Sequence, residues 1–253
     1  MSKLLITNFM RLWKDKIFWV CIAVMGGKAL YSTIGILYGV AKRGNEATLG
    51  NVFFGYATYI LVLGAIFCSL FIGTEYSDGT IRNKLVMGHS RRKIYCANLI
   101  VCIIANLIMC LAHIAVSLIG LSLGFYTSIA DTLLGLLCSF VLVCSITSLF
   151  TMISMLSKRK TVAAVICIVL SFLLLLYAYE IRNEVCMAWQ NGEEKPFYEF
   201  LYSFLPSCQA VQLADEPEMF NTTSPILRIL YALVLFVLTT GIGLFLFEKK
   251  DLD

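Results

Sequence analysis

The sequence predicts an all-α membrane protein built from six transmembrane helices, and three observations support that prediction. Of the 253 residues, 59% are hydrophobic and 14% are charged, whereas soluble domains carry about 25% charged residues. Mean hydropathy is high, at +0.84. The apolar residues gather in runs of about 20, the length that a helix needs to cross the hydrocarbon core of a bilayer. These values argue against a water-soluble α/β enzyme, and a net charge of +4 is too small and scattered to indicate a nucleic-acid partner.

The first element, over residues 1–16, is predicted to be an amphipathic helix ahead of the first span. Apolar and polar side chains separate onto two faces of the helical wheel, a pattern typical of helices that lie in the membrane interface. The alternative is an ordinary connecting segment that leads into the first span. The apolar face is Leu5, Ile6, Phe9, Met10, Leu12 and Trp13, and the polar face is Lys3, Thr7, Asn8, Arg11 and Lys14.

The six predicted spans are residues 17–40, 52–73, 94–123, 132–156, 161–179 and 226–247. Their orientation follows from the basic residues, because cytoplasmic loops carry an excess of lysine and arginine. With the N-terminus inside, fourteen of the twenty basic residues fall on the inner side, and the outer segments hold only Lys42, Arg43, Arg182 and Lys195. We therefore predict a multi-pass protein with both termini in the cytoplasm.

The segment 180–225 is the long outer connection before the last span. It contains an apolar cluster that a fully solvated loop would not need, so we predict one or two short helices that lie at or dip into the outer leaflet. Pro206 and Pro225 are expected to separate the pieces. The cluster is Phe197, Phe200, Leu201, Phe204 and Leu205.

The chain has ten cysteines and two histidines. Most of the cysteines lie inside apolar runs, where cysteine behaves as a small hydrophobe, and no C-x-x-C pair indicates a metal site. His89 and His113 cannot form a metal site alone, so none is predicted. A disulfide between Cys186 and Cys208, which share the outer segment, is left open.

A polar segment, TEYSDGTIRNKLVMGHSRRK, residues 74–93, separates the second span from the third. Asp78 is suited to cap a short helix that begins at Thr80. Gly88 is suited to end that helix, and Ser90 to cap the next one. The segment is therefore predicted to hold a short, capped helix between two spans.

This short helix is expected to present Arg82, Asn83 and Lys84 to a partner. Ile81 and Leu85 are four residues apart and would form an apolar ridge beside them. The alternative is a basic loop that only fixes the topology. That alternative accounts for the basic run at residues 91–93 better than for the ordered stretch E-Y-x-D-G-T-I-R-N.

The stretch EYSDGTIRNKLVMGHSRRKIYCANL resembles the first cytoplasmic loop of the type-2 ATP-binding-cassette (ABC) permeases. In that family an acidic residue ends the second span and a G-T-I/L-R/E-x-L-L-x-x-x-x-S-R pattern follows. The layout of the family is matched as well. It has six spans, an N-terminal elbow helix, a long last outer loop and a tail similar to F-x-K-K-D-L, which is Phe247–Leu252 in this sequence. The resemblance implies that the short helix is a coupling helix that docks into a separate ATPase subunit. It assigns to this ATPase-coupling site Glu75, Asp78, Gly79, Thr80, Arg82 and Asn83.

The same resemblance implies a function. The chain would be the permease of a bacterial exporter that moves amphipathic or antimicrobial peptides, or hydrophobic drugs, by alternating access. It would work in the bacterial cell membrane as a homodimer with two copies of a cytoplasmic ABC ATPase, and peptide-antibiotic resistance is one expected role. No G-x-x-x-x-G-K-[ST] motif is present, so the chain is not expected to be an enzyme or to hold a cofactor. ATP and Mg²⁺ would belong to the partner.

Three alternatives are kept. One is a subunit that exports a polysaccharide or a lipid-linked cargo. Another is a membrane receptor or scaffold without transport, from which no ATPase would co-purify. The third is an ion-coupled secondary transporter, which is disfavoured because it would need paired carboxylates inside the membrane and broken helices.

Five residues are candidates for the substrate path. Lys28 lies 12 residues beyond Lys16, or about 18 Å along a helix, so its charge should face a cavity or a partner. Pairing with a neighbouring helix and snorkelling are the alternatives. The others are aromatic residues of the second span, which packing in the core or against lipid would also explain: Phe53, Phe54, Tyr56 and Tyr59.

Overall fold

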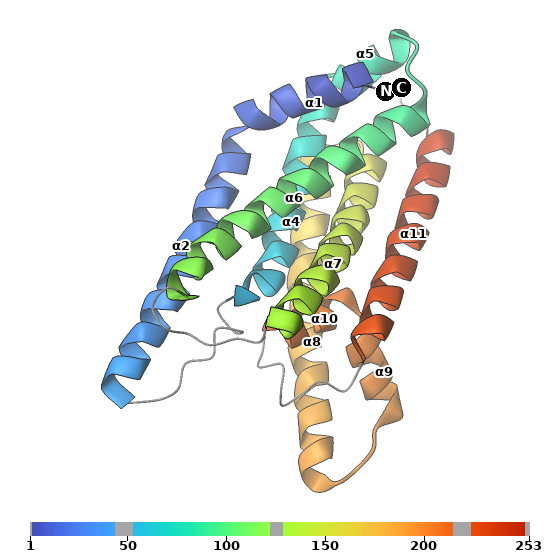
Figure 1. The fold of residues 1–253 in the computed structure, drawn as a ribbon. Coiled ribbons are helices and arrows are strands. Elements are labelled where there is room, and N and C mark those ends of the chain that lie inside the picture. Colours follow the sequence, from blue (N-terminus) through green and yellow to red (C-terminus); the bar gives the residue numbers. More distant parts are fainter. Residues whose placement is uncertain (1, 44–52, 122–128, 215–223, 251–253) are drawn as a thin grey trace.

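The computed structural model describes residues 2–43, 53–121, 129–214 and 224–250 (Figure 1). All regular structure in these ranges is helical. Six of the helices are long and apolar enough to cross a membrane, which confirms the predicted fold class. They are α2 (Lys16–Arg43), α4 (Tyr56–Ser77), α6 (Arg91–Leu121), α7 (Ile129–Leu156), α8 (Lys160–Asn191) and α11 (Pro225–Lys249).

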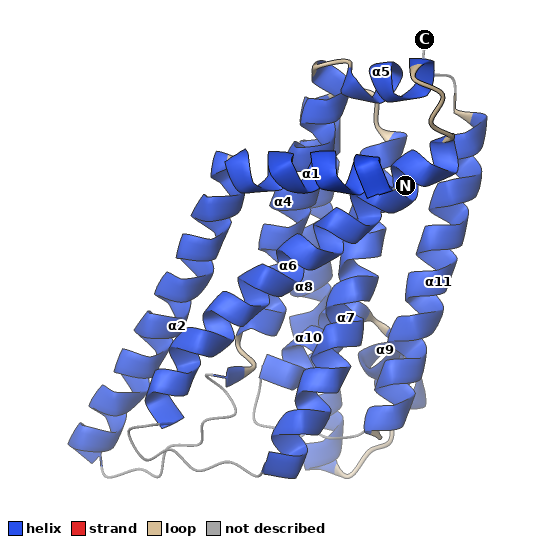
Figure 2. Cartoon of the chain, turned by 45° about the horizontal axis from the view of Figure 1, so that its top comes forward, coloured by secondary structure: helices blue, strands red, loops and turns tan. Residues whose placement is uncertain are grey.

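Four shorter helices lie at or toward the two ends of this bundle. Figure 2 shows α1 lying across the long helices, with α5 beside it at the same end, which we call the α5 end. Helices α9 and α10 lie toward the opposite end, called the α9 end (Figure 1). Their bounds are α1 (Ser2–Lys14), α5 (Thr80–Val86), α9 (Pro196–Phe204) and α10 (Pro206–Ala214).

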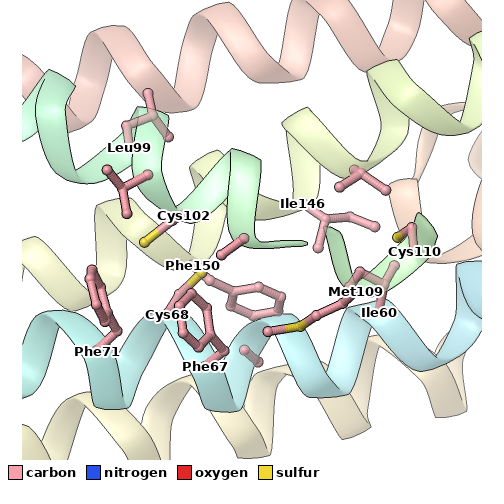
Figure 3. Packing of buried hydrophobic residues seen from close by; sticks show 14 of the residues in the cluster. Ile60, Phe67, Cys68, Phe71, Leu99, Cys102, Met109, Cys110, Ile146 and Phe150 are labelled. Atoms are coloured by element: carbon pink, nitrogen blue, oxygen red, sulfur yellow. The ribbon is translucent and has the colours of Figure 1, made fainter. Parts of the chain in front are cut away.

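Helix α4 forms the centre of the bundle. In the most apolar stretch of α4, 61% of the residues are buried, whereas in that of α11 only 11% are buried. Helix α4 packs on both α7 and α8. Figure 3 shows Phe67 and Phe71 of α4 in one cluster with Phe150 of α7. Cys68 and Cys102 lie in that cluster as free thiols, consistent with their predicted behaviour as small hydrophobes.

The faces of α1 differ from the two-sided pattern predicted for it. Asn8, placed on the polar face, is buried together with Leu4 and Leu12, and its amide contacts α6. Ile6 and Met10 remain exposed. The reason is that the polar stripe has a buried polar partner on α6, so part of that stripe turns into the protein.

The fifth long helix extends twelve residues beyond the predicted end of the span at Tyr179. Ile181, Val185 and Ala188 recur at helical spacing and are buried, which gives the polar extension an apolar stripe to bury. The helix ends at Gly192, whose φ of 71° is a left-handed conformation that suits glycine. At 32 residues, α8 is about 48 Å long.

The two short helices predicted in the outer segment are present as α9 and α10. Pro206 separates them and Pro225 begins α11, as predicted. The side chains of α10 from Pro206 to Leu213 are buried. Gln212 donates to the carbonyl of Tyr202 at 2.6 Å and ties α10 to α9. How deeply the two helices enter a membrane remains a prediction.

None of the ten cysteines is joined in a disulfide. Cys186 lies on the extension of α8, and Cys208 is buried in α10. The disulfide that the sequence left open between these two residues is not formed.

Candidate functional site

The turn between α4 and α5 is built around a left-handed glycine. Asp78 was predicted to be the N-cap of the short helix, but it instead ends α4, its backbone N–H donating to the carbonyl of Thr74 at 2.9 Å. Gly79 precedes α5 with a φ of 67°, and this conformation reverses the chain at once. The Thr80 hydroxyl donates to the carbonyl of Glu75 at 3.0 Å. Gly88, with a φ of 84°, follows α5 as predicted.

A closed ring of polar side chains lies directly beneath this turn. We call Glu75, Lys84, Asn8 and Asn98 the polar ring. The Lys84 ammonium forms an ion pair with Glu75 Oε1 and donates to Asn8 Oδ1 at 2.9 Å. The Asn8 amide donates to Asn98 Oδ1 at 2.7 Å, and the Asn98 amide donates to Glu75 Oε2 at 2.7 Å. The ring therefore joins α4, α5, α1 and α6.

Arg11 of α1 adds a second cation to the same carboxylate. Its guanidinium forms an ion pair with Glu75 Oε1 and donates to the carbonyl of Phe71 at 2.7 Å. It also lies over the Phe71 ring, 3.8 Å from the centroid, an arrangement that favours a cation electrostatically. One buried carboxylate thus holds α1 and α5 against α4.

The ion pair of the polar ring is almost fully withdrawn from solvent, whereas the Arg11 side chain is 30% exposed. The side chain of Glu75 is 0% exposed and that of Lys84 is 8% exposed. A buried ion needs a partner and further hydrogen bonds to offset the loss of hydration. Each oxygen of Glu75 has at least one donor, and the Lys84 ammonium has two acceptors. The arrangement therefore depends on all of its members.

The outward face of α5 differs from the prediction. Lys84 is buried in the polar ring, and Ile81 is buried in the core instead of forming an exposed ridge. Because those two residues anchor the helix, Arg82 and Asn83 point outward. Val86 is 83% exposed and Met87 is 68% exposed. An exposed apolar pair beside a basic residue, on a short helix held at its base, is typical of a docking surface.

The end of α11 is tied to the same end of the bundle. The Arg91 guanidinium, at the start of α6, donates to the carbonyls of Phe247, Glu248 and Lys250, which have no partner within their own helix. The Lys250 ammonium donates to the Tyr76 hydroxyl and to the Met155 carbonyl, each at 2.9 Å. We call these contacts of Arg91 and Lys250 the tail clamp. They connect α11 to α4, α6 and α7.

Burial lowers the pKa of Lys250 to about 8, and the like charge of Lys158 adds to the shift. The ammonium is therefore held in the clamp at a cost in hydration, which its two acceptors partly offset. The Tyr76 ring, with its centroid 4.3 Å from the ammonium, offsets a further part of that cost.

Replacement of Arg91 by alanine should fray the end of α11, because three carbonyls lose their donor. We expect faster amide hydrogen exchange over residues 244–250 in detergent micelles, with a loss of about 1–3 kcal/mol of local protection. Arg92→Ala is the comparison, since Arg92 is 71% exposed and forms a surface ion pair with the Glu248 side chain instead of bonding the helix carbonyls, so its loss should cost less than about 1 kcal/mol. Equal exchange in the two variants would show that the tail clamp does not hold the helix end.

A comparison with known protein families agrees with this architecture. A family model described as "ABC-2 family transporter protein" matches residues 8–252. The chain belongs to the ABC-2 transporter family. It is therefore a membrane-embedded transporter subunit, a class that acts with a separate ATPase. No curated protein matches the sequence significantly.

The sequence pattern had placed Glu75 of this ABC-2 permease on the surface that meets the ATPase. The structure places it inside, where it supports α5 from below. Asn8, Arg11 and Asn98 were missed as members of the site. An asparagine inside an otherwise apolar run is the signal that could have marked Asn98, because a polar side chain in a span usually has a partner.

The aromatic residues predicted for the substrate path fall into two groups. Phe53, Phe54 and Tyr56 are buried among the helices of the permease, and the Tyr56 hydroxyl donates to Ser139 of α7 at 2.6 Å. This placement favours the packing alternative for all three. Tyr59 is exposed beside Lys28.

Lys28 of α2 lies between two aromatic rings. Its ammonium is 5.0 Å from the centroid of Tyr59 on α4 and 5.4 Å from that of Tyr31 on its own helix. Cation–π contacts of this kind contribute about 0.5–2 kcal/mol each. A charge at the centre of a bilayer costs several kcal/mol, so the two rings offset only part of that cost.

Proposed function

We propose that the chain is the permease of an ATP-driven exporter, with α5 as its coupling helix. The α5 end would face the cytoplasm, where the ATPase is, and the α9 end the exterior. Two copies of the chain and two copies of the ATPase would form the working transporter. Closure of the ATPases on ATP would push α5 and so shift the spans between inward-open and outward-open arrangements.

The observation that carries this proposal is the contrast between the two sides of α5. Its inner side is bonded to α1, α4 and α6 through Lys84 and Glu75. Its outer side exposes Arg82, Val86 and Met87. A force applied to the exposed side would therefore reach α1, α4 and α6 together. Most of the basic residues also lie at this end, which supports a cytoplasmic position.

The cargo we propose is an amphipathic or antimicrobial peptide, or a hydrophobic drug, moved out of the cell. The described spans are apolar and rich in aromatic residues, and α2 and α8 carry long exposed apolar faces. Such faces suit amphipathic cargo better than small ions. Protection against a peptide antibiotic is the physiological role that this cargo implies.

The coupling helix can be tested with charge changes on its exposed face. Arg82→Glu should weaken binding of the ATPase by at least about tenfold, because a reversed charge at an interface costs more than the 1.4 kcal/mol that a factor of ten represents. Val86→Asp should act in the same direction. The measurement is co-purification of the ATPase from native membranes, together with cargo-stimulated ATP hydrolysis in vesicles.

Arg82→Lys keeps the charge and serves as the matched control. Lys42→Glu makes the same charge reversal at the outer end of α2 and should leave the ATPase bound. Normal binding and transport in both Arg82→Glu and Val86→Asp would mean that α5 only fixes the topology. Failure of any ATPase to co-purify with the wild type would favour the receptor or scaffold alternative.

A further inference from the structure

Lys28 is the residue of the membrane-spanning region whose charge the described fold leaves unmatched. It lies 12 residues from Lys16 and 11 from Gly39, the two ends of the apolar stretch of α2, and the distance along the helix from Lys16 is about 18 Å. Its side chain is half-buried, and it contacts the rings of Tyr31 and Tyr59. It forms no ion pair with a carboxylate in the part of the chain that the structure describes.

The sequence also argues against the spans of a second copy of the chain as the source of the missing negative charge. Each of the six apolar runs, at residues 17–40, 56–74, 94–121, 132–156, 161–179 and 226–247, contains no Asp or Glu. The apolar runs of a partner permease would therefore bring no carboxylate to the depth of Lys28. No carboxylate of residues 2–43, 53–121, 129–214 and 224–250 pairs with Lys28. Because an unmatched ammonium at this depth is costly, a bound molecule is a suitable source of the counter-charge.

The surroundings of Lys28 indicate the shape of that molecule. Tyr31 is 74% exposed and Tyr59 is 39% exposed, so the cation and its rings open onto one face between α2 and α4. Helices α2 and α4 run in opposite directions, so Val24 and Leu63 both lie one turn closer to the α5 end. Val24 is exposed and Leu63 is partly buried. A charged group at Lys28 thus adjoins apolar surface along the membrane normal.

We propose that Lys28, Tyr31 and Tyr59 bind the anionic group of an amphipathic cargo, a carboxylate or a phosphate on an apolar chain. The ammonium pairs with the anion, the two rings flank the headgroup, and the chain lies along α2 and α4 toward the α5 end. This inference rests on the proposed transport function for its cargo. The binding step can be measured without transport.

The binding experiment uses the full-length permease in nanodiscs of phosphatidylcholine, with dansylated undecanoic acid as the probe and its methyl ester as the neutral match. The wild type should bind the acid at least about tenfold more tightly than the ester, a difference of about 1.4 kcal/mol. Lys28→Met should remove that preference and leave ester binding unchanged. Lys28→Arg and Tyr59→Phe should retain it, and Tyr59→Ala should reduce it.

Lys42→Met is the matched control. Lys42 also stacks on a tyrosine of α2, Tyr38, at 5.4 Å, but it lies at the outer end of the helix. The control should bind both probes as the wild type does. Equal binding of acid and ester by the wild type, or an unchanged preference in Lys28→Met, would overturn the proposal.

Two further outcomes separate the possible sources of the anion. If phosphatidylglycerol in the nanodiscs displaces the acid from the wild type, the site holds a membrane lipid and the assignment to cargo is wrong. In vesicles with the ATPase, the wild type should export the acid and Lys28→Met should not, while both export the ester. Intact acid binding without any ATP-driven export would contradict the transport function and leave the anion site standing.

Discussion

Replacing Glu75 with glutamine should destabilise the protein more than any other single change at the α5 end. The glutamine would fit the space but would leave Lys84 buried without a counter-charge. Breaking a buried ion pair by removing one partner costs about 3–5 kcal/mol. We expect a lower thermal-unfolding temperature in detergent micelles and weaker amide protection in both α1 and α5. In vesicles, ATP hydrolysis should continue without export.

The double variant Glu75→Gln/Lys84→Met should recover part of this loss, because it removes the stranded cation together with its partner. Glu184→Gln is the surface control. Glu184 pairs with Lys195 at 2.9 Å with both side chains exposed, so the free energy of unfolding should change by less than about 1 kcal/mol. A Glu75→Gln variant as stable as this control would mean that the polar ring does not hold the α5 end together.

A second large effect is expected at Gly243 of α11. A Cβ at this position would overlap the hydroxyl of Tyr95 from α6 and approach Met152 of α7 at 3.1 Å. Tyr95 is fully buried, so it has no room to withdraw. Gly243→Leu should therefore cost about 1–3 kcal/mol of stability or prevent α11 from packing, as measured by thermal unfolding of the purified protein.

Gly241 supplies the matched control for this change. It lies two residues earlier on α11, and a Cβ there meets no atom within 4 Å. Gly241→Leu should leave stability unchanged or raise it slightly, because glycine is a poor helix former. If both variants unfold at the same temperature, the contact of α11 with α6 and α7 is looser than the structure indicates.

The sequence predicted six long apolar helices correctly because their signal is local. Each apolar run carries its own length and hydropathy, and the glycine at position 88 marks the end of α5 by its own conformational freedom. The extension of α8 was missed for a related reason. Ile181, Val185 and Ala188 form a stripe only at helical spacing, among many polar residues, and the surface they cover belongs to α9 and α10.

The polar ring could not be predicted from the sequence because it forms only through tertiary contacts. Asn8 and Asn98 are 90 residues apart, and nothing in either neighbourhood specifies the other. Lys84 looked like a solvent-facing residue beside Arg82, since both are basic and only two positions apart. Only the path of α1 over the bundle decides which of the two turns inward.

The closed form of the polar ring also bears on how motion would pass through this end of the molecule. Each of its four members is bonded to two others, so a helix that departs must give up both bonds at once and leave buried polar groups without partners. Such a joint resists small displacements and yields abruptly. We therefore expect α1, α4, α5 and the start of α6 to move as one piece as long as the ring is closed, and to separate in a single step if it opens.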